Sequence, residues 1–356
     1  MVEKKKVKPV RVESSVNPKI EQFVKTLLKD RKEDNSIFNL ESFGTVINLE
    51  PIGIPTLDFT VLGGGLAEGR TYELFGHESS GKSTLALQIA ANRQRVYPDK
   101  DVIFIDSEHA LDMVYAKKLG LDLARVWVSQ PDYGEQALSV AQDLMRSGYF
   151  SLMVADSVAA LTPKAIVDGD IGDTTVAVQA RLMSQALKTL VPIANQSKVT
   201  MLFTNQMRSK IGVRFGPTET TPGGNALKYY ASVRLQLTTI GKIKDSAGNV
   251  IGNTVQVRAV KNKLFPPFRE TELKLYYGSG FSRESSLVDM AVALNIVVKD
   301  GARYEYGGQS YKGEGALVTA CRESTELCEE LMDGVKREVV AESQKENKTE
   351  QEENEK

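Results

Sequence analysis

The chain has 356 residues, of which 41% are hydrophobic and 26% charged, so it has enough apolar side chains for a sizeable core. The formal net charge is −1, so overall charge gives no indication of a nucleic-acid partner. No apolar run reaches the roughly 18 residues of a membrane-spanning helix, no secretory signal is evident, and we expect a cytoplasmic protein without a membrane partner. Cys321 and Cys328 form neither a disulfide framework nor a zinc motif.

The first 45 residues are expected to form a basic tail followed by one amphipathic helix. Asn17 and Pro18 are typical of a helix start, with a capping residue before a proline at the first helical position. The apolar positions that follow recur with helical spacing, namely Ile20, Phe23, Val24, Leu27 and Leu28. Such a face must be buried against the chain's own core or against a neighbouring subunit.

From about residue 46 the pattern alternates between short apolar strands and helices. We expect strands at 72–75, 102–106, 126–129, 152–156 and 199–205, and helices near 82–97, 109–119, 135–147 and 176–191. This alternation predicts an α/β fold with a mostly parallel sheet covered on both faces. Later strands at 231–239, 254–260 and 271–277, with a turn at Gly248-Asn249, predict an antiparallel extension of the same sheet.

The expected organisation is therefore an N-terminal tail and amphipathic helix at 1–45, a core at 46–280, a small α/β C-terminal domain at 281–340 and a disordered tail at 341–356. A Gly/Ser-rich joint near residue 280 separates the last two folded parts. The final residues are rich in Glu, Lys, Asn and Gln, which favours disorder.

The segment 76–84, GHESSGKST, fits the phosphate-binding pattern GxxxxGK[ST] and lies between a predicted strand and a predicted helix. Glycines allow the backbone N–H groups to point inward at phosphate oxygens, and the helix N-terminus adds positive potential. We expect Lys82 to neutralise the β- and γ-phosphates and the Ser83 hydroxyl to bind Mg²⁺. The residues expected to contact nucleotide here are Gly76, Glu78, Ser79, Ser80, Gly81, Lys82, Ser83 and Thr84.

Two acidic side chains follow buried strands of the predicted sheet. Asp156 ends the strand LMVAD, where it would face the ligand crevice and hold Mg²⁺ through water. Glu108 lies just beyond the strand VIFID and is our candidate for polarising the water that attacks the γ-phosphate.

The connection between Gln206 and Lys228 is too long for an ordinary loop and is rich in Gly, Thr and Pro. It carries Arg208, Lys210, Arg214 and the aromatic Phe215 against one acid, Glu219. Basic side chains beside an aromatic suit a strand of phosphates and unstacked bases. Composition alone leaves two readings open, a DNA-binding loop and a substrate lid.

With these motifs the sequence resembles the RecA recombinase family. The resemblance extends from about residue 45 to 335 and is carried by GHESSGKST, IDSEHALD, VADSVAALTPKA, the stretch 204–234, VKNK at 260–263 and LYYGSG. It implies a P-loop RecA-type core and a DNA-dependent ATPase, with ATP and Mg²⁺ as cofactors. It also implies that the N-terminal helix docks on the next subunit of a filament. It further implies a recombinase that forms helical filaments on single-stranded DNA, pairs it with homologous duplex DNA and exchanges strands in recombinational repair. Whether it also stimulates self-cleavage of a repressor in the SOS response stays open.

The resemblance also implies roles for individual residues. Glu108 would activate water, Gln206 would sense the γ-phosphate, and Lys261 and Lys263 would reach the γ-phosphate held by a neighbouring subunit. Adenine would be contacted by Asp112, Tyr115 and Tyr277. Loops at 168–175 and 207–226 would hold DNA, through Arg181, Arg208, Lys210, Arg214, Phe215, Gly223, Gly224 and Asn225.

Some positions depart from the family pattern. His77 stands where proline is usual and Ser83 where threonine is commoner, and neither change removes a needed group. Arg214 replaces a usual apolar residue, and the loop at 168–175 has acids but no base. Two alternatives are a hexameric motor, which would share the phosphate loop but would not need the N-terminal helix or the 207–226 loop in this form, and a regulatory paralogue, which would join filaments without exchanging strands. The argument against the paralogue is that four residues of the site are intact, namely Lys82, Glu108, Asp156 and Gln206.

Overall fold

The structure is a computed structural model that describes residues 18–31, 47–170, 176–209 and 219–354. The chain divides into two compact units, Met1–Asn48 and Leu49–Lys356. The first unit contains the helix α1 (Pro18–Arg31), which begins at the predicted proline. Ile20 and Phe23 of its apolar face are 60% and 65% exposed. The described residues include no helix long and apolar enough to cross a membrane.

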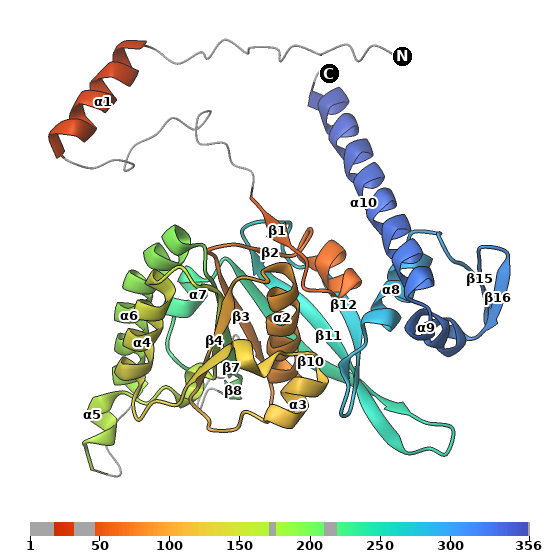
Figure 1. The fold of residues 1–356 in the computed structure, drawn as a ribbon, viewed down its shortest axis with the longest axis horizontal. Helices are drawn as coiled ribbons and strands as arrows, with labels where there is room; N and C mark the ends of the chain where they lie inside the picture. Colours follow the sequence, from red (N-terminus) through yellow and green to blue (C-terminus); the bar gives the residue numbers. More distant parts are fainter. Residues whose placement is uncertain (1–17, 32–46, 171–175, 210–218, 355–356) are drawn as a thin grey trace. The chain divides into compact units, whose positions relative to one another are not determined.

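The second unit is built on a nine-stranded sheet with the order β13-β12-β11-β10-β3-β7-β6-β4-β5 (Figure 1). Its parallel part consists of β3 (Thr71–Gly76), β4 (Asp101–Asp106), β5 (Val126–Ser129), β6 (Phe150–Asp156) and β7 (Thr200–Gln206). The long strand β10 (Val233–Lys244) pairs parallel with β3 and antiparallel with β11 (Val250–Asn262). The antiparallel extension ends in β12 (Glu270–Tyr276) and β13 (Gly280–Phe281). The predicted fold class is confirmed.

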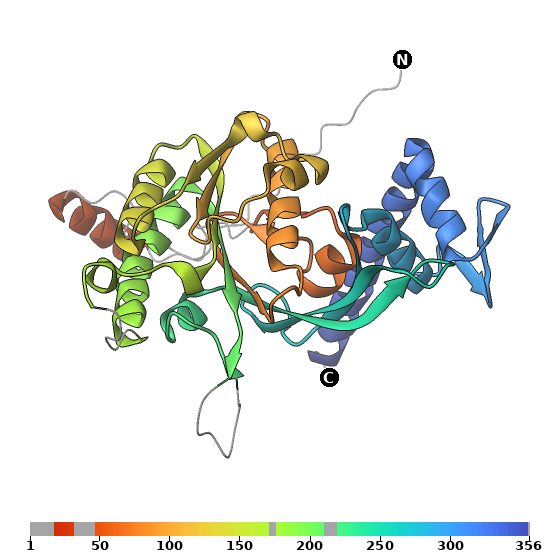
Figure 2. The ribbon, with the colours of Figure 1, turned by 90° about the horizontal axis from the view of Figure 1, so that it is seen from below.

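Helices cover both faces of the sheet, and the alternation of side chains along β4 shows why. Val102 and Phe104 pack in the cluster that contains α2 (Lys82–Val96), whereas Ile103 and Ile105 pack with α4 (Gly134–Arg146) and α6 (Val176–Ser197). Figure 2 shows α4 and α6 on the side of the sheet away from α2. Because both faces are buried, the strands are apolar throughout rather than alternating with polar residues.

A segment preceding the sheet was not predicted. It contains β1 (Leu49–Glu50), the π-helix η1 (Thr56–Val61) and β2 (Leu66–Ala67). Asp58 of η1 is 2% exposed, and its carboxylate accepts hydrogen bonds from the backbone N–H groups of residues 52–54 at 2.7–3.1 Å. These bonds satisfy a carboxylate that would otherwise be costly to bury. The other short elements are α3 (Met113–Lys118), η2 (Leu123–Arg125), η3 (Val158–Ala160), α5 (Lys164–Val167), β8 (Arg208–Ser209), β9 (Glu219–Thr220) and α7 (Ala226–Tyr230).

The C-terminal part has a hydrophobic cluster of its own. It comprises α8 (Arg283–Ala293), a small sheet of β14 (Val298–Asp300), β15 (Arg303–Tyr306) and β16 (Gln309–Lys312), then α9 (Glu314–Glu323) and α10 (Thr325–Asn354). It is tied to η1, because the Thr56 N–H donates to Ser286 Oγ at 2.9 Å, and it belongs to the same compact unit as the core. The expected boundary at 280 stays a prediction.

The structure differs from the expectation for the end of the chain. Residues 341–354, predicted to be disordered, continue α10 as a helix. The physical reason is that Glu, Lys and Gln have high helix propensity, and no Gly or Pro follows Gly334.

Candidate nucleotide and DNA site

The carboxyl ends of four parallel strands meet at one edge of the sheet. Gly76 of β3 is in register with Gln206 of β7, and Asp106 of β4 is in register with Asp156 of β6. Ligands of open α/β sheets bind in the crevice outside these ends. The register therefore brings together the phosphate loop and the strand-end residues singled out in the sequence.

The phosphate loop connects β3 to α2 through a backbone that only a few residues can adopt. Ser79 and Gly81 have φ angles of 59° and 88°, in the left-handed region that favours glycine. A Cβ on Gly76 would lie 2.3 Å from the carbonyl oxygen of Leu237. The loop is thus held tightly against β10 while its N–H groups remain at the start of a 15-residue helix.

Lys82 is folded back over the loop. Its Nζ donates to the carbonyl oxygens of His77 at 2.7 Å and Gly76 at 3.2 Å, and the residue is 8% exposed. Burial lowers the pKa of Lys82, while the negative charges of Asp156, Glu108 and Glu78 act in the opposite direction. Because the partners of Lys82 Nζ are neutral carbonyl oxygens, negatively charged phosphate oxygens would be stronger acceptors for it.

Asp156 lies between the phosphate loop and β7. The buried Thr204 hydroxyl donates to Asp156 Oδ1, and Asp156 is also hydrogen-bonded to Ser83. Burial raises the pKa of Asp156, and these two hydrogen bonds oppose the rise. The contact between Ser83 and Asp156 unites the two residues predicted to hold Mg²⁺.

Glu108 and Gln206 are brought into direct contact from different strands. Gln206 Nε2 donates to Glu108 Oε1 at 3.3 Å, and the Ser157 hydroxyl donates to the same oxygen. The loop that carries Glu108 is fixed by Asp106, which accepts from the backbone N–H of Ala110 at 3.1 Å. Glu108 itself is exposed, so its carboxylate is open to water.

A cleft of about 510 Å³ extends from the phosphate loop toward β12. It is lined by Ser79 and Gly81–Thr84, by the predicted Tyr115 and Tyr277, and by four residues that the sequence analysis missed, Asn253, Leu275, Tyr276 and Gly278. Tyr115 is anchored by a 3.2 Å contact between its hydroxyl and that of Thr84.

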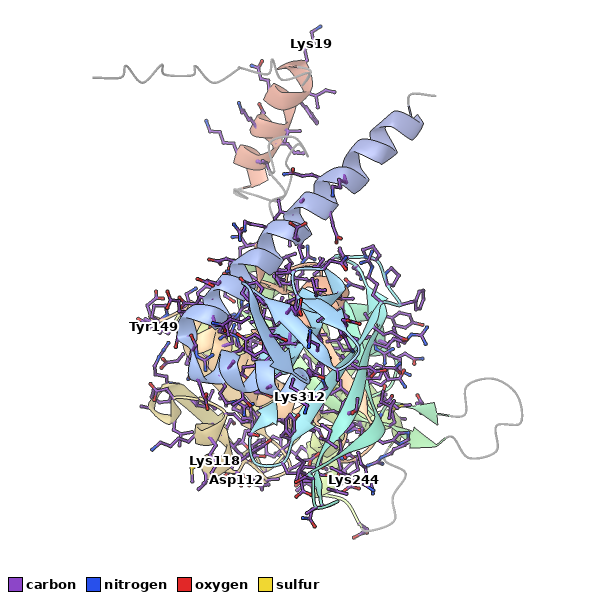
Figure 3. The ribbon with its side chains drawn as sticks, turned by 90° about the vertical axis from the view of Figure 1, so that its right-hand side faces the viewer. Lys19, Asp112, Lys118, Tyr149, Lys244 and Lys312 are labelled. Atoms are coloured by element: carbon purple, nitrogen blue, oxygen red, sulfur yellow. The ribbon has the colours of Figure 1, made fainter. Side chains whose placement is uncertain are left out.

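Asp112 holds the start of α3, and its carboxylate accepts from the N–H groups of Val114 and Tyr115 at 2.9 Å. In Figure 3 it lies near Lys118 at the other end of this short helix.

The described part of the 207–226 segment is attached to the phosphate edge through Asn205. The Asn205 side chain is fully buried and donates to Glu73 Oε1 at 3.0 Å and to the Pro222 carbonyl at 3.1 Å. Glu73 in turn accepts from Arg234 Nε at 2.5 Å. None of these three polar residues was predicted. The one available signal was that Asn205 directly precedes Gln206.

The predicted DNA-binding residues fall into three groups. Gly223 and Gly224 are packed tightly, because a Cβ there would lie within 2.8 Å of Val158 and 2.7 Å of Ala180 respectively. Arg181, Arg208 and Asn225 are exposed. Lys210, Arg214 and Phe215 lie outside the described residues, as do residues 171–175 of the other loop.

Lys261 and Lys263 are not directed at the phosphate loop of their own chain. Lys261 Nζ donates to the carbonyls of Lys228 and Tyr229 at 2.7 and 2.9 Å, at the end of α7. Lys261 belongs to β11, and Lys263 follows directly after the end of this strand at Asn262. They are still close enough to interact: burial, then the charge of Lys263, lower the pKa of Lys261.

Comparison with known proteins identifies the family of this chain. The family model of the RecA N-terminal domain matches residues 19–282. The chain is 48% identical over 299 residues to Protein RecA of Rhizobium leguminosarum, covering 83% of this chain and 84% of that protein. The chain belongs to the RecA family.

Two further relatives agree. Protein RecA of Acinetobacter baylyi is 47% identical over 302 residues, which are 85% of this chain and 84% of that protein. Protein RecA of Clavibacter michiganensis is 52% identical over 265 residues, 74% and 72% of the two chains. The chain is accordingly a DNA-dependent ATPase that exchanges DNA strands in recombination and repair, binds ATP and DNA, and forms filaments.

Proposed function

We propose that Glu108 is the residue that polarises the attacking water during ATP hydrolysis, with Gln206 as the group that reports the γ-phosphate. The observation that carries this proposal is the direct contact of Gln206 Nε2 with Glu108 Oε1, beside Lys82 and Asp156. A carboxylate exposed to water at this edge suits a group that must orient water. Lys82 would exchange its carbonyl partners for phosphate oxygens when ATP binds.

Ser83 and Asp156 are the residues that would hold Mg²⁺. A hydroxyl and a carboxylate in contact fit a hard cation that takes one or two protein oxygens and completes its shell with phosphates and water. The described residues contain no group of three or more His, Cys, Asp or Glu side chains that could hold a metal, which agrees with a cation that arrives with the nucleotide. When bound, Mg²⁺ would neutralise charge on the β- and γ-phosphates.

The nucleotide state would reach the DNA loops through β7. Gln206 contacts Glu108 on one side, and its neighbour Asn205 contacts Pro222 at the far end of the loop. A shift of Gln206 on γ-phosphate binding or loss would therefore bias the loop between two arrangements. The proposed DNA contacts are those of the exposed Arg181, Arg208 and Asn225, together with Lys210, Arg214, Phe215, Gly223 and Gly224.

In the filament, Lys261 and Lys263 would contribute cations to the γ-phosphate of the neighbouring subunit. The hydrogen bonds of Lys261 to the end of α7, away from its own phosphate loop, support action on another copy. We further propose single-stranded DNA as the polymerisation template and homologous duplex DNA as the second substrate, in the cytoplasm. Adenine contact by Asp112, Tyr115 and Tyr277, and action on a self-cleaving repressor, stay predictions.

The test is steady-state ATP hydrolysis with and without single-stranded DNA. We expect strong stimulation in the wild-type chain. Glu108→Gln keeps the hydrogen-bonding shape but removes the charge, so turnover should fall by about 10²-fold or more while DNA binding persists. Lys82→Ala should abolish nucleotide binding and provides the background. Normal turnover by Glu108→Gln would show that Glu108 does not have the proposed role. Hydrolysis at the same rate with and without DNA would show that the ATP and DNA sites are not coupled.

A further inference from the structure

A second cavity, of about 490 Å³, lies on the C-terminal side of α2, away from the phosphate loop. One wall is the face of α2 that carries Gln88, Asn92 and Arg95, spaced so that they share one side of the helix. The remaining walls come from residues 52–54, Leu119, Tyr276 with the segment 279–284, and Arg322 of α9. Its volume is in the range of small-molecule sites.

The cavity carries a net positive charge. Its lining contains three arginines, Arg95, Arg283 and Arg322, and a single acid, Glu284. Arg322 is partly compensated by Glu284 at 3.6 Å. The guanidinium groups of Arg95 and Arg283 make no hydrogen bond or ion pair within the described part of the chain. Asp58 behind the wall acts electrostatically on Arg283, but even with Asp58 ionised the local charge remains positive.

The walls of this cavity are fixed rather than loose. Gln88 both donates to the Phe281 carbonyl at 2.9 Å and accepts from the Phe281 N–H at 2.8 Å. Gly280 has a φ of 80°, and a Cβ there would lie 2.6 Å from Leu119 at the end of α3 and 2.8 Å from Gln88 of α2, so the segment is packed tightly against both. The opposite wall, residues 52–54, is held by Asp58. Such a site needs little reorganisation to receive a ligand.

We propose that this cavity binds a small phosphate-bearing molecule, with Arg95, Arg283 and Arg322 as its anion ligands. Guanidinium groups are suited to phosphate because their planar donors can bind two oxygens at once. The Ser279 hydroxyl in the lining adds a neutral donor. A cavity of about 490 Å³ has room for a terminal oligophosphate, whereas the continuous backbone of a nucleic acid would extend beyond it. The proposal is independent of the catalytic roles assigned above.

The cavity shares a wall with the ATP cleft. Tyr276 lines both this cavity and the ATP cleft, and the segment that follows forms the wall of each in turn. Arg283 and Arg322 belong to α8 and α9, so a bound anion would also connect the core to the C-terminal part. We expect a ligand here to alter the affinity for ATP, and reciprocally.

The experiment titrates inorganic tripolyphosphate into the full-length chain carrying Lys82→Ala, by calorimetry, so that the phosphate loop does not compete. We expect saturable binding at one site, weakened about ten-fold to a hundred-fold by adding Arg283→Ala. The matched control adds Arg303→Ala, which removes the same charge from an exposed arginine of β15 outside the cavity, and should leave binding unchanged. If Lys82→Ala does not fold, the same series is measured on chains saturated with ADP.

Three results would overturn the proposal. The first is no saturable binding of tripolyphosphate, and the second is equal weakening by Arg283→Ala and Arg303→Ala, which would mean general charge attraction. The third is displacement of tripolyphosphate by a short single-stranded oligonucleotide in an Arg283-dependent manner. That outcome would identify the occupant as DNA backbone instead of a small molecule. Arg283-dependent binding that the oligonucleotide does not displace would support the proposal.

Discussion

The side chain of Asn205 joins the phosphate edge of β7 to the far end of the 207–226 segment. Its amide nitrogen donates to a carboxylate of β3 and to the Pro222 carbonyl, and its Oδ1 accepts from the N–H of Gln206 at 3.0 Å. A buried amide with all three bonds made is rigid, because breaking one leaves an unpaired group in a low dielectric. Asn205 is therefore a positioning residue between two sites.

We predict that Asn205→Ala lowers the stimulation of ATP hydrolysis by single-stranded DNA more than it lowers the rate without DNA. The substitution removes the bond to Pro222 but no group proposed to touch ATP. It also leaves Glu73 with one partner fewer, so the free energy of unfolding should fall by about 1–3 kcal/mol. The ratio of the two hydrolysis rates and urea unfolding measure the two effects.

Thr200→Val provides the control on the same strand. The Thr200 hydroxyl is also fully buried, but it bonds Arg93 and the Ala67 carbonyl at the opposite end of β7. Its loss should cost stability and leave the DNA stimulation ratio at the wild-type value. An equal drop in the ratio for both variants would show that Asn205 acts only through stability.

Sequence reasoning found the side chains that follow strands and missed those that work through distant partners. Glu108 and Asp156 could be predicted because strand ends of a parallel sheet converge. Asn205 and Glu73 could not be paired, because they are 132 residues apart and neither belongs to a motif. The arginine-lined cavity could not be predicted either, because its walls come from five separate segments of the chain.

Among the secondary-structure elements, those with a clear hydrophobic pattern could be predicted and the others could not. Apolar runs bounded by helices predicted β3 to β7 because both faces of that sheet are buried. The π-helix η1 left no periodic signal, since residues 51–62 are nearly uniformly apolar around one acid, and the role of Asp58 depends on a turn that only the fold creates. The end of α10 differs from the expected disorder because a polar composition is typical both of disordered segments and of exposed helices.

Lys274 connects the last long strand of the sheet to two C-terminal helices. Its ammonium donates to Glu314 of α9 and lies 3.6 Å from Asp289 of α8. Although burial acts to lower the pKa of Lys274, the hydrogen bond to Glu314 and the charge of Asp289 raise it overall. Burial raises the pKa of Asp289, and the charge of Lys274 opposes that rise.

We predict that Lys274→Met destabilises the chain by about 1–2 kcal/mol near neutral pH, because two neighbouring carboxylates lose their shared cation. A lysine with a raised pKa contributes stability below its usual pKa and loses it as the pH rises through the raised value. The cost should therefore shrink at strongly alkaline pH. It should also shrink in acid, as Asp289 becomes protonated. Urea unfolding across the pH range measures this bell-shaped difference.

Lys312→Met is the control for this element. Lys312 lies at the end of β16 and is exposed (Figure 3). Its replacement should change the unfolding free energy by less than about 0.5 kcal/mol at every pH. A flat, pH-independent cost for Lys274→Met would contradict the assigned ion pairs.

Large apolar side chains are exposed on α1 and β5 of the single chain. The helix α1 exposes Ile20 and Phe23, and the edge strand β5 exposes Trp127 and Val128 at 57% and 46%. An unpaired apolar edge invites pairing with another chain. For a family that forms filaments, these surfaces are reasonable contacts between successive copies.

We predict that Phe23→Asp abolishes filament formation and leaves the folded monomer intact. Because Phe23 is 65% exposed in the single chain, a carboxylate at this position should cost the monomer little stability. Burying the same carboxylate in an apolar contact between subunits would cost several kcal/mol. Sedimentation with ATP and single-stranded DNA measures assembly, and thermal unfolding measures the monomer. The control is Gln22→Asp, which adds the same charge to the adjacent exposed polar position of α1. If both variants polymerise like the wild type, α1 is not a filament contact.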